Sequence, residues 1–313
     1  MIAPSSPLAA QHVAPTTGSN PLGTVLIWEL RRLWASHIGR ALIGLPLLFF
    51  AGLLWLKHSW LLATDGGEQV LVAGGSALGL LSQLVFVLLL LFGLCLPFLA
   101  ADSVARDYRQ RTHELLMTTP VPTWSYVWGR FLAALLLCIG LAVELLLATF
   151  AVNLALHRAH ADYPAPDPGT LLGLWALTVL PTTVLLASVS FALGTFWPRA
   201  ATVLKLIVLV AWVMLVIVGS SLVYFHASSW YPYWNPTSYD LALRAQADVL
   251  MRYQAQAGGV QDAAARLTIA RAVQGQLLDV RPWILPHTGL GALGLGLVAT
   301  AAFGFRRFRA VIG

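Results

Sequence analysis

Residues 131–156 read FLAALLLCIGLAVELLLATFAVNLAL and contain a single charged side chain, that of Glu144. A helix of about 20 apolar residues is long enough to cross the hydrocarbon core of a bilayer, which is roughly 30 Å thick. No water reaches that core, so a spanning segment must satisfy its backbone hydrogen bonds internally, as a helix does. The stretch therefore predicts a membrane-spanning helix and an integral membrane fold.

The composition of the whole chain agrees with this prediction. The 313 residues are 58% hydrophobic and 10% charged, with a mean hydropathy of +0.76, whereas soluble domains carry about 25% charged residues. The significance of the net charge of +6 depends on which side of the membrane the charged residues lie. The charge is therefore no argument for a nucleic-acid partner, and we expect none. Cys95 and Cys138 both lie in apolar runs, which predicts buried thiols and no disulfide framework.

Five further apolar runs predict an all-α protein with six membrane-spanning helices. The fourth run contains Pro181, which a membrane helix tolerates because neighbouring helices can satisfy the carbonyl that proline leaves without a donor. Together the spans form one domain over residues 38–313. They lie at 38–56, within 70–101, at 131–156, within 169–197, near 205–224 and near 283–305.

The residues before the first span divide into two parts. Residues 1–19 lack a basic segment followed by an apolar core, so they indicate a disordered tail and no signal peptide. Residues 20–37 begin with Asn20 and Pro21, a typical N-cap and first helical residue. Tryptophans and arginines favour an amphipathic helix in the plane of the membrane interface, and an ordinary packed helix is the alternative. Its apolar stripe comprises Leu22, Val25, Leu26, Leu33 and Trp34, with Glu29 and Arg32 off the stripe.

Residues 102–130, here called the elbow, join the second span to the third and are rich in arginine. An amphipathic helix is expected over residues 102–117. Pro120 and Pro122 then break it, because the residue before a proline is pushed out of the helical region. A new helix is expected to start near Thr123. An ordinary positively charged loop is the alternative interpretation.

Residues 225–282, here called the cap, form the one sizeable segment between spans. The cap begins with the aromatic residues Trp230, Tyr231, Tyr233 and Trp234, which suit a membrane-interface belt or, alternatively, a lateral gate beside an exit path. Two helical stretches follow, separated by Gly258-Gly259. The first carries acids and arginines at i,i+4 spacing, which predicts a charged helix face; these residues are Asp240, Arg244, Asp248 and Arg252.

The positive charges predict the orientation of the chain. If the N-terminus is cytoplasmic, twelve of the 19 lysines and arginines fall on the cytoplasmic side, and short outer loops hold two. Short loops that remain in the cytoplasm are enriched in such residues, whereas long segments are translocated largely regardless of charge. Both termini and the elbow are therefore predicted to be cytoplasmic, and the cap is predicted to lie outside.

The motifs of familiar enzymes are missing from the sequence. A phosphate-binding loop ends in Gly-Lys-Ser/Thr, but Lys57 precedes His and Lys205 precedes Leu. His157 and His160 lie in a proline-rich loop, where a hydrated loop is favoured over a metal site. No serine lies in a G-x-S-x-G motif. We therefore expect no catalysis, no metal and no cofactor on this chain.

Glu144 is the one acid deep within a predicted span. Carboxyl groups inside a membrane are costly and usually face a bundle interior or a wet cavity. One interpretation places Glu144 in a translocation path or at a subunit interface. The other is a structural hydrogen bond to a neighbouring span.

The elbow resembles the segment after the second span of ABC-2-type permeases. That family has an acid, then Gly-Thr-x-Glu-x-Leu, then Thr/Ser-Pro-Val, and then Gly-Lys before the third span. Here Arg111 replaces the glycine and Arg130 replaces the lysine, and the cap is longer than is usual in the family. The matching residues are Ala101-Asp102-Ser103, Arg106-Asp107, Arg111-Thr112-His113-Glu114-Leu115-Leu116, Thr119-Pro120-Val121 and Gly129-Arg130.

The resemblance implies that residues 38–313 form a permease domain, in the bacterial cytoplasmic (inner) membrane, of an ABC transporter that most simply exports its substrate. Two such subunits, alike or different, would bind two ATPase subunits that hold ATP and Mg²⁺. The elbow would serve as the coupling helix that docks on the ATPase. The docking candidates are Arg106, Arg109, Arg111, Glu114, Leu115, Pro120 and Pro122.

Three alternatives stay open. The complex would pass ATP-driven motion to an extracytoplasmic partner through the cap, without transport. An ion-driven carrier would show broken helices and an inverted repeat, which the sequence does not display. A lipid-modifying membrane enzyme would gather several acids or histidines at one depth, and Glu144 stands alone there.

Overall fold

The structure, a computed structural model, describes residues 20–37, scattered positions between 40 and 56, residue 89, and residues 91–109, 121–159, 165–225, 231–237, 239–274 and 281–305. Across these residues the chain is helical and contains no strand, as predicted. Its elements are α1 (Pro21–Ala35), α5 (Asp102–Arg109), α7 (Thr123–Ala159), α8 (Pro168–Phe196), the short 3₁₀ helix η1 (Pro198–Ala200), α9 (Ala201–Phe225), α10 (Tyr231–Trp234), α11 (Tyr239–Ala257), α12 (Ala263–Gln274) and α13 (Arg281–Gly304).

Four described helices are long and apolar enough to cross a membrane. They are Thr123–Ala159, Leu171–Phe196, Pro198–Ile217 and Arg281–Gly304, and a shorter apolar helix covers Leu91–Ala100. The four overlap the third to sixth predicted spans. Only scattered positions of the first span and the last part of the second are described, so the total of six stays a prediction.

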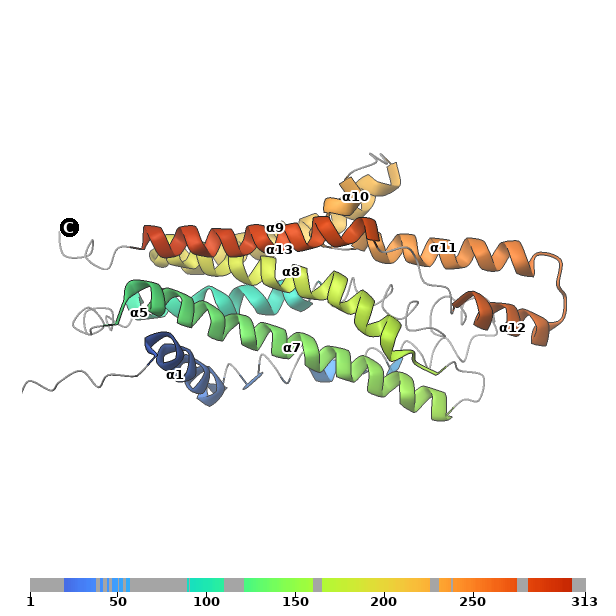
Figure 1. The fold of residues 1–313 in the computed structure, drawn as a ribbon, viewed down its shortest axis with the longest axis horizontal. Coiled ribbons are helices and arrows are strands. Elements are labelled where there is room, and N and C mark those ends of the chain that lie inside the picture. The colour runs from blue at the N-terminus through green and yellow to red at the C-terminus, as the bar shows by residue number, and fades with distance from the viewer. Residues whose placement is uncertain are drawn as a thin grey trace, which may run out of the picture.

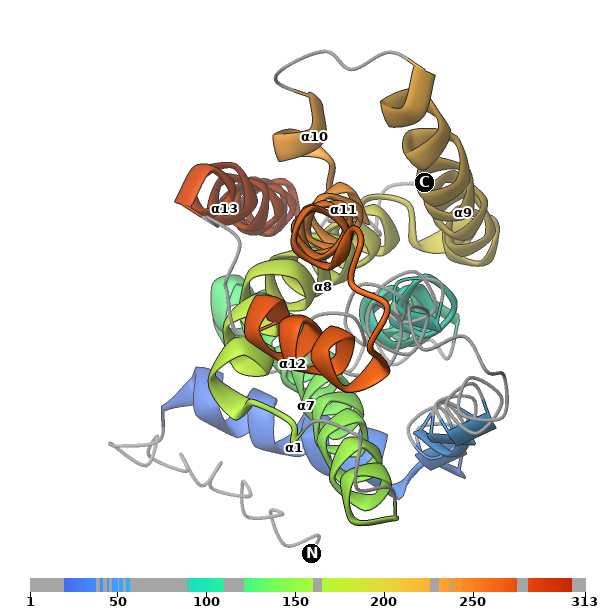
Figure 2. The ribbon, with the colours of Figure 1, turned by 90° about the vertical axis from the view of Figure 1, so that its right-hand side faces the viewer.

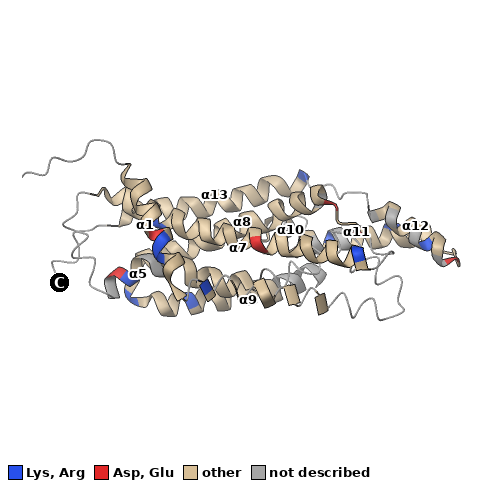
Figure 3. Cartoon of the chain, turned by 90° about the horizontal axis from the view of Figure 1, so that it is seen from below, with Lys and Arg blue, Asp and Glu red and all other residues tan. Residues whose placement is uncertain are grey.

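The long helices lie side by side along one axis (Figure 1). One end of the bundle, here called the elbow end, contains α1, α5, the start of α7 and the end of α8. Helices α11 and α12 extend beyond the opposite end, here called the cap end. Charged residues concentrate toward the two ends, and the middle of the bundle contains almost none (Figure 3). This distribution suits a bundle whose middle lies in hydrocarbon and whose ends meet water.

Helix α8 is the centre of the packing. It packs most extensively against α13 and also contacts α7, α9 and α5, and the view along the bundle shows it between α7 and α13 (Figure 2). Buried side chains such as Phe131, Phe191 and Val298 fill the space around it. Gly194 brings the backbones together, because a Cβ there would collide with the carbonyl oxygen of Ala101. The elbow end of α8 therefore rests directly against the residue that precedes α5.

The interior of α8 is unusually polar for a membrane-length helix, with buried Thr178, Thr182, Thr183 and Thr195. Each of these hydroxyls donates a hydrogen bond to the carbonyl four residues earlier, at 2.7–2.8 Å. Such back-bonding satisfies a hydroxyl without help from another helix. The polar side chains are thus compatible with an apolar surrounding.

Helix α1 begins as the sequence predicts but packs on a different face. The Asn20 side chain accepts from the backbone N–H of Leu22 at 3.2 Å and so caps the helix. Glu29 and Leu33 are the buried side chains, whereas Trp34 is 61% exposed. The predicted stripe is therefore wrong for Glu29 and Trp34, because α1 packs on α7 with Glu29 on the buried side and Trp34 facing outward.

The cap contains α10, α11 and α12, with the turn at Gly258-Gly259 where the sequence predicts it. Asp248 and Arg252 pair at 2.8 Å, as the charged-face prediction requires. That prediction is wrong for Asp240, which is fully buried and accepts a hydrogen bond from Asn235 at 2.7 Å. Arg244 lies instead over the rings of Tyr233 and Trp283, at 5.4 and 5.8 Å.

Candidate functional site

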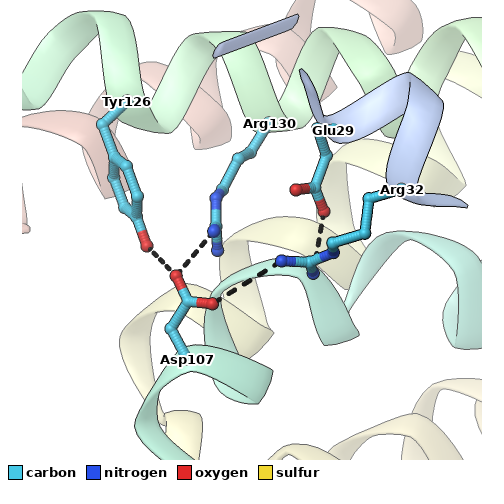
Figure 4. Close-up of polar contacts among 5 residues, drawn as sticks. All are labelled: Glu29, Arg32, Asp107, Tyr126 and Arg130. Atoms are coloured by element: carbon cyan, nitrogen blue, oxygen red, sulfur yellow. Dashed lines mark hydrogen bonds and ion pairs between the residues drawn. The ribbon is translucent and has the colours of Figure 1, made fainter. Parts of the chain in front are cut away.

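Five polar side chains from three helices meet at the elbow end (Figure 4). Helix α1 contributes Glu29 and Arg32, α5 contributes Asp107, and α7 contributes Tyr126 and Arg130. We call these five residues the elbow cluster. They join the helix at the N-terminus, the start of the elbow and the helix that follows the elbow.

Asp107 lies at the centre of the elbow cluster. Its Oδ2 accepts a hydrogen bond from the Tyr126 hydroxyl at 2.6 Å and lies 2.6 Å from Nη2 of Arg130. Its Oδ1 lies 3.8 Å from Nη1 of Arg32. Asp107 is 2% exposed and Arg130 is 1% exposed. Charge-assisted contacts of this length are stronger than neutral ones, so α5 is fastened to α7 by a buried ion pair.

The α1 side of the cluster contains a second ion pair and an aromatic ring. Oε1 of Glu29 lies 3.1 Å from Nη2 of Arg32, with the Glu29 side chain fully buried. The guanidinium of Arg32 lies 5.0 Å from the Trp28 ring centre, and that of Arg130 lies 4.5 Å from the Tyr126 ring centre. Cations over ring faces gain further attraction where water is excluded.

Helical spacing explains how the sequence builds this cluster. Tyr126 and Arg130 are four residues apart and Glu29 and Arg32 three apart, so each pair shares one helix face. Gly129 lets the two helices approach, because a Cβ there would lie 2.8 Å from Cγ1 of Val25 and 3.2 Å from the Leu22 carbonyl oxygen. Helices α1 and α7 accordingly form one of the most extensive contacts in the protein.

Burial sets the protonation behaviour of the α1 pair. Loss of water raises the pKa of Glu29, although Arg130, Arg32 and Arg106 each attract the ionised form. Loss of water also lowers the pKa of Arg32, against the attraction of Glu29. Desolvation therefore outweighs the ion pair at Glu29.

Replacing Glu29 by glutamine is expected to flatten the pH dependence of stability. Because folding raises the pKa of Glu29, the folded chain binds this proton more tightly than the unfolded chain. The Glu29 contribution to stability is therefore full at low pH and falls as pH rises through the raised pKa. Melting curves of wild type and Glu29→Gln between about pH 5 and about pH 8 measure this difference. A wild type that gains stability over the variant as pH rises would contradict it.

The structure places some of the predicted docking residues beside this cluster. Arg106 is half-buried in α5, and Pro122 is exposed immediately before α7. Arg109 ends α5, but its side chain is not among those described. The remaining docking residues lie outside the described residues: Arg111, Glu114, Leu115 and Pro120.

The other predicted residues do not join the cluster. Glu144 is half-buried in the middle of α7, and its Oε2 is buried with no hydrogen-bond partner among the described residues. In the cap, Tyr233 is half-buried and Trp234 is 43% exposed. Tyr231 begins α10, without a described side chain, and Trp230 lies outside the described residues.

Sequence reasoning missed Asp107, Tyr126 and Glu29 as parts of one site. The i,i+4 pair of Tyr126 and Arg130 carries a signal, because both point to one side of a helix next to an arginine-rich loop. No chemistry of a metal centre emerges, since the described residues contain no group of three metal-ligating side chains.

The fold and the cluster define an all-helical, multi-pass membrane protein. The chain belongs to the family described as ABC-2 family transporter protein, whose model matches residues 67–239, more than half of the 313 residues. This confirms the resemblance seen in the elbow, and the matched range contains the elbow, α7, α8 and α9. Members are permease subunits of ABC transporters, which usually work with separate ATPase chains. A search of curated proteins finds no match to the chain.

Proposed function

We propose that this chain is the permease half of an ABC exporter in the bacterial cytoplasmic membrane, driven through its elbow by two ATPase subunits that hold ATP and Mg²⁺. A second permease subunit, the same or different, completes the pathway. The elbow end is then cytoplasmic, as the distribution of positive charge requires, and the cap lies outside. This chain holds no cofactor and performs no chemistry of its own.

One observation supports this proposal above the others: the buried Asp107–Arg130 ion pair, at 2.6 Å, connects α5 with α7. An elbow that received force from an ATPase needs a firm attachment to a spanning helix, or the movement would be lost in the loop. The ion pair, the Tyr126 hydrogen bond and the Arg32 contact supply that attachment. Movement at the elbow would therefore displace α7 and α1 together.

Reversing the charge of Glu114 is expected to release the ATPase. Glu114 matches the family's elbow glutamate, and charge reversal within an interface both removes an attraction and adds a repulsion. The tagged wild-type chain should copurify from native membranes with Mg²⁺-dependent ATPase activity. Glu114→Arg should retain less than about a tenth of that activity, which corresponds to a loss of at least about 1.4 kcal/mol in binding free energy. Unchanged copurified activity would overturn the docking role.

Asp248→Arg provides a matched control for this experiment. Asp248 is likewise an acidic residue on a helix, but it lies in α11 of the cap, far along the chain from the elbow, and pairs with Arg252. The same reversal of charge there should leave the copurified ATPase activity unchanged. A similar loss in both variants would point to a general effect on folding and not to docking.

The length of the outer part favours a second function on the same scaffold, transmission of ATP-driven motion to an extracytoplasmic partner. Helix α7 has 37 residues, about 55 Å of helix, whereas the hydrocarbon core is roughly 30 Å thick. The buried core includes Val249 of α11 and Val273 of α12, so it continues into the cap.

Glu144, half-buried within α7, is our candidate for a polar contact along a translocation path or between subunits.

A further inference from the structure

Helix α8 contains a break in its hydrogen-bond ladder at Pro181. Proline has no backbone N–H, and its ring crowds the carbonyl four residues earlier, which here is that of Leu177. A carbonyl left without a donor inside a membrane is costly. The donor comes from another helix: Nδ1 of His287, in α13, lies 2.9 Å from the Leu177 oxygen.

The chemistry of this contact determines which ring nitrogen of His287 carries the hydrogen. A carbonyl oxygen only accepts hydrogen bonds, so Nδ1 must carry the hydrogen. The His287 side chain is 1% exposed, and its Nε2 is buried with no hydrogen-bond partner among the described residues. The Leu177 contact is therefore what orients the ring, and the centres of the His287 and Trp283 rings lie 5.8 Å apart in an edge-to-face arrangement.

The residue next to Pro181 holds the cap. Oγ1 of Thr182 lies 2.8 Å from the carbonyl oxygen of Thr178 in its own helix and 2.8 Å from that of Pro236, between α10 and α11. A hydroxyl has one proton to donate, so the two carbonyl oxygens share it, and Thr182 links α8 to the cap. The aromatic contact of Tyr233 with Trp283, at 4.8 Å, fastens the cap to α13 at the same level.

The C-terminal end of α8 touches the elbow. Gly194 lies against the carbonyl of Ala101, one residue before α5. Thirteen residues, about 20 Å of helix, separate this contact from Pro181. One helix thus contacts the elbow side at its C-terminal end and the cap near its middle, at Thr182, and its own backbone ladder is interrupted beside that cap contact.

We propose that His287 is a positioning residue for transport: it replaces the donor that Pro181 lacks, joins the outer part of α8 to α13, and so makes the cap follow α8 when the elbow moves. The inference rests on the proposed ATPase-driven function. On this inference, His287 and Thr182 transmit a movement to the cap. Pro181 leaves the Leu177 carbonyl without a donor in its own helix, so α8 needs the hydrogen bond from α13.

A double-mutant cycle tests the hydrogen bond. His287→Leu should lower the melting temperature, whereas His287→Asn, whose side-chain N–H can occupy the place of Nδ1–H, should restore most of it. Pro181→Ala supplies a backbone N–H to the Leu177 carbonyl, so His287→Leu should be nearly neutral in that background. Equal losses for His287→Leu and His287→Asn, or equal losses with and without Pro181, would overturn the assignment.

A second measurement separates coupling from simple stability. Two spin labels report the distance from the cap to the elbow end in the complex with its ATPase. One is attached at Met251→Cys, which is exposed in α11, and the other at Phe303→Cys, which is exposed near the elbow end of α13. ATP should change this distance in the wild-type background and in His287→Asn, but not in His287→Leu, while ATP hydrolysis continues in all three. An equal change in His287→Leu overturns the inference alone. A complex that shows no ATP hydrolysis at all overturns the proposed function and the inference with it.

Discussion

Asp107→Asn is expected to cost about 3–5 kcal/mol of stability, because it removes one partner of a buried ion pair and leaves the other charge in place. The Arg130 guanidinium, 1% exposed, would keep its positive charge where water cannot reach it. Tyr126, which donates to the same carboxylate at 2.6 Å, would also lose its charged acceptor. Thermal melting in detergent measures the loss.

The same variant is expected to uncouple the elbow from the spans. Without the Asp107–Arg130 ion pair, α5 is attached to α7 by packing and neutral hydrogen bonds, so ATP hydrolysis by a bound ATPase should continue while transport falls. The double variant Asp107→Asn with Arg130→Gln removes both charges, and it should recover part of the lost stability, because the uncompensated charge is gone. A single variant as stable as wild type would contradict the role given to Asp107.

Asp248→Asn is the control for this prediction. Asp248 also pairs with an arginine, at 2.8 Å, but its side chain is 28% exposed and that of Arg252 is 38% exposed. Exposed pairs at i,i+4 contribute about 0.3–0.5 kcal/mol. The contrast between the two asparagine variants isolates burial as the cause of the larger effect.

The described spans and the start of α7 could be predicted from the sequence because each depends on neighbouring residues. Apolar runs of membrane length identify helices without knowledge of their partners. Likewise, Pro122 and the change of pattern after it predict a helix start near Thr123, where α7 begins. The family resemblance used the same local information.

The elbow cluster could not be predicted, because its members are distant in the chain. Glu29 lies 78 positions before Asp107, and a charged residue on a short amphipathic helix normally faces water. Nothing local shows that α1 lies against α7 and that Glu29 points into that contact. The position of Gly129 makes the contact close, but a glycine beside an arginine is also typical of a simple turn.

For the polar contacts near the cap, the sequence predicted that a donor would be needed but not which residue would supply it. Pro181 indicated that a neighbouring helix would satisfy a freed carbonyl. The sequence did not show that His287, 110 residues away from Leu177, would be the donor. The i,i+4 pattern in α11 was misleading for Asp240, because that side chain is buried and accepts a hydrogen bond from Asn235.

Gly194→Ala is expected to destabilise the protein by about 1–3 kcal/mol, the usual cost of forcing an extra carbon atom into a filled space. The new methyl group would meet the backbone carbonyl of Ala101. A flexible side chain could rotate away from such a clash, but a backbone carbonyl can move only if its helix moves. The expected response is therefore a separation of α8 from the start of the elbow, with loss of transport as well as of stability.

Gly173→Ala, in the same helix, is the matched control. A Cβ at Gly173 meets nothing within 4 Å, so alanine there should be neutral or stabilise by about 0.5–1 kcal/mol, the helical advantage of alanine over glycine. Melting temperatures and transport of the two variants provide the comparison. If Gly194→Ala behaved like Gly173→Ala, the close contact between α8 and the elbow would be refuted, because the same chemical change would then find the same open space at both positions.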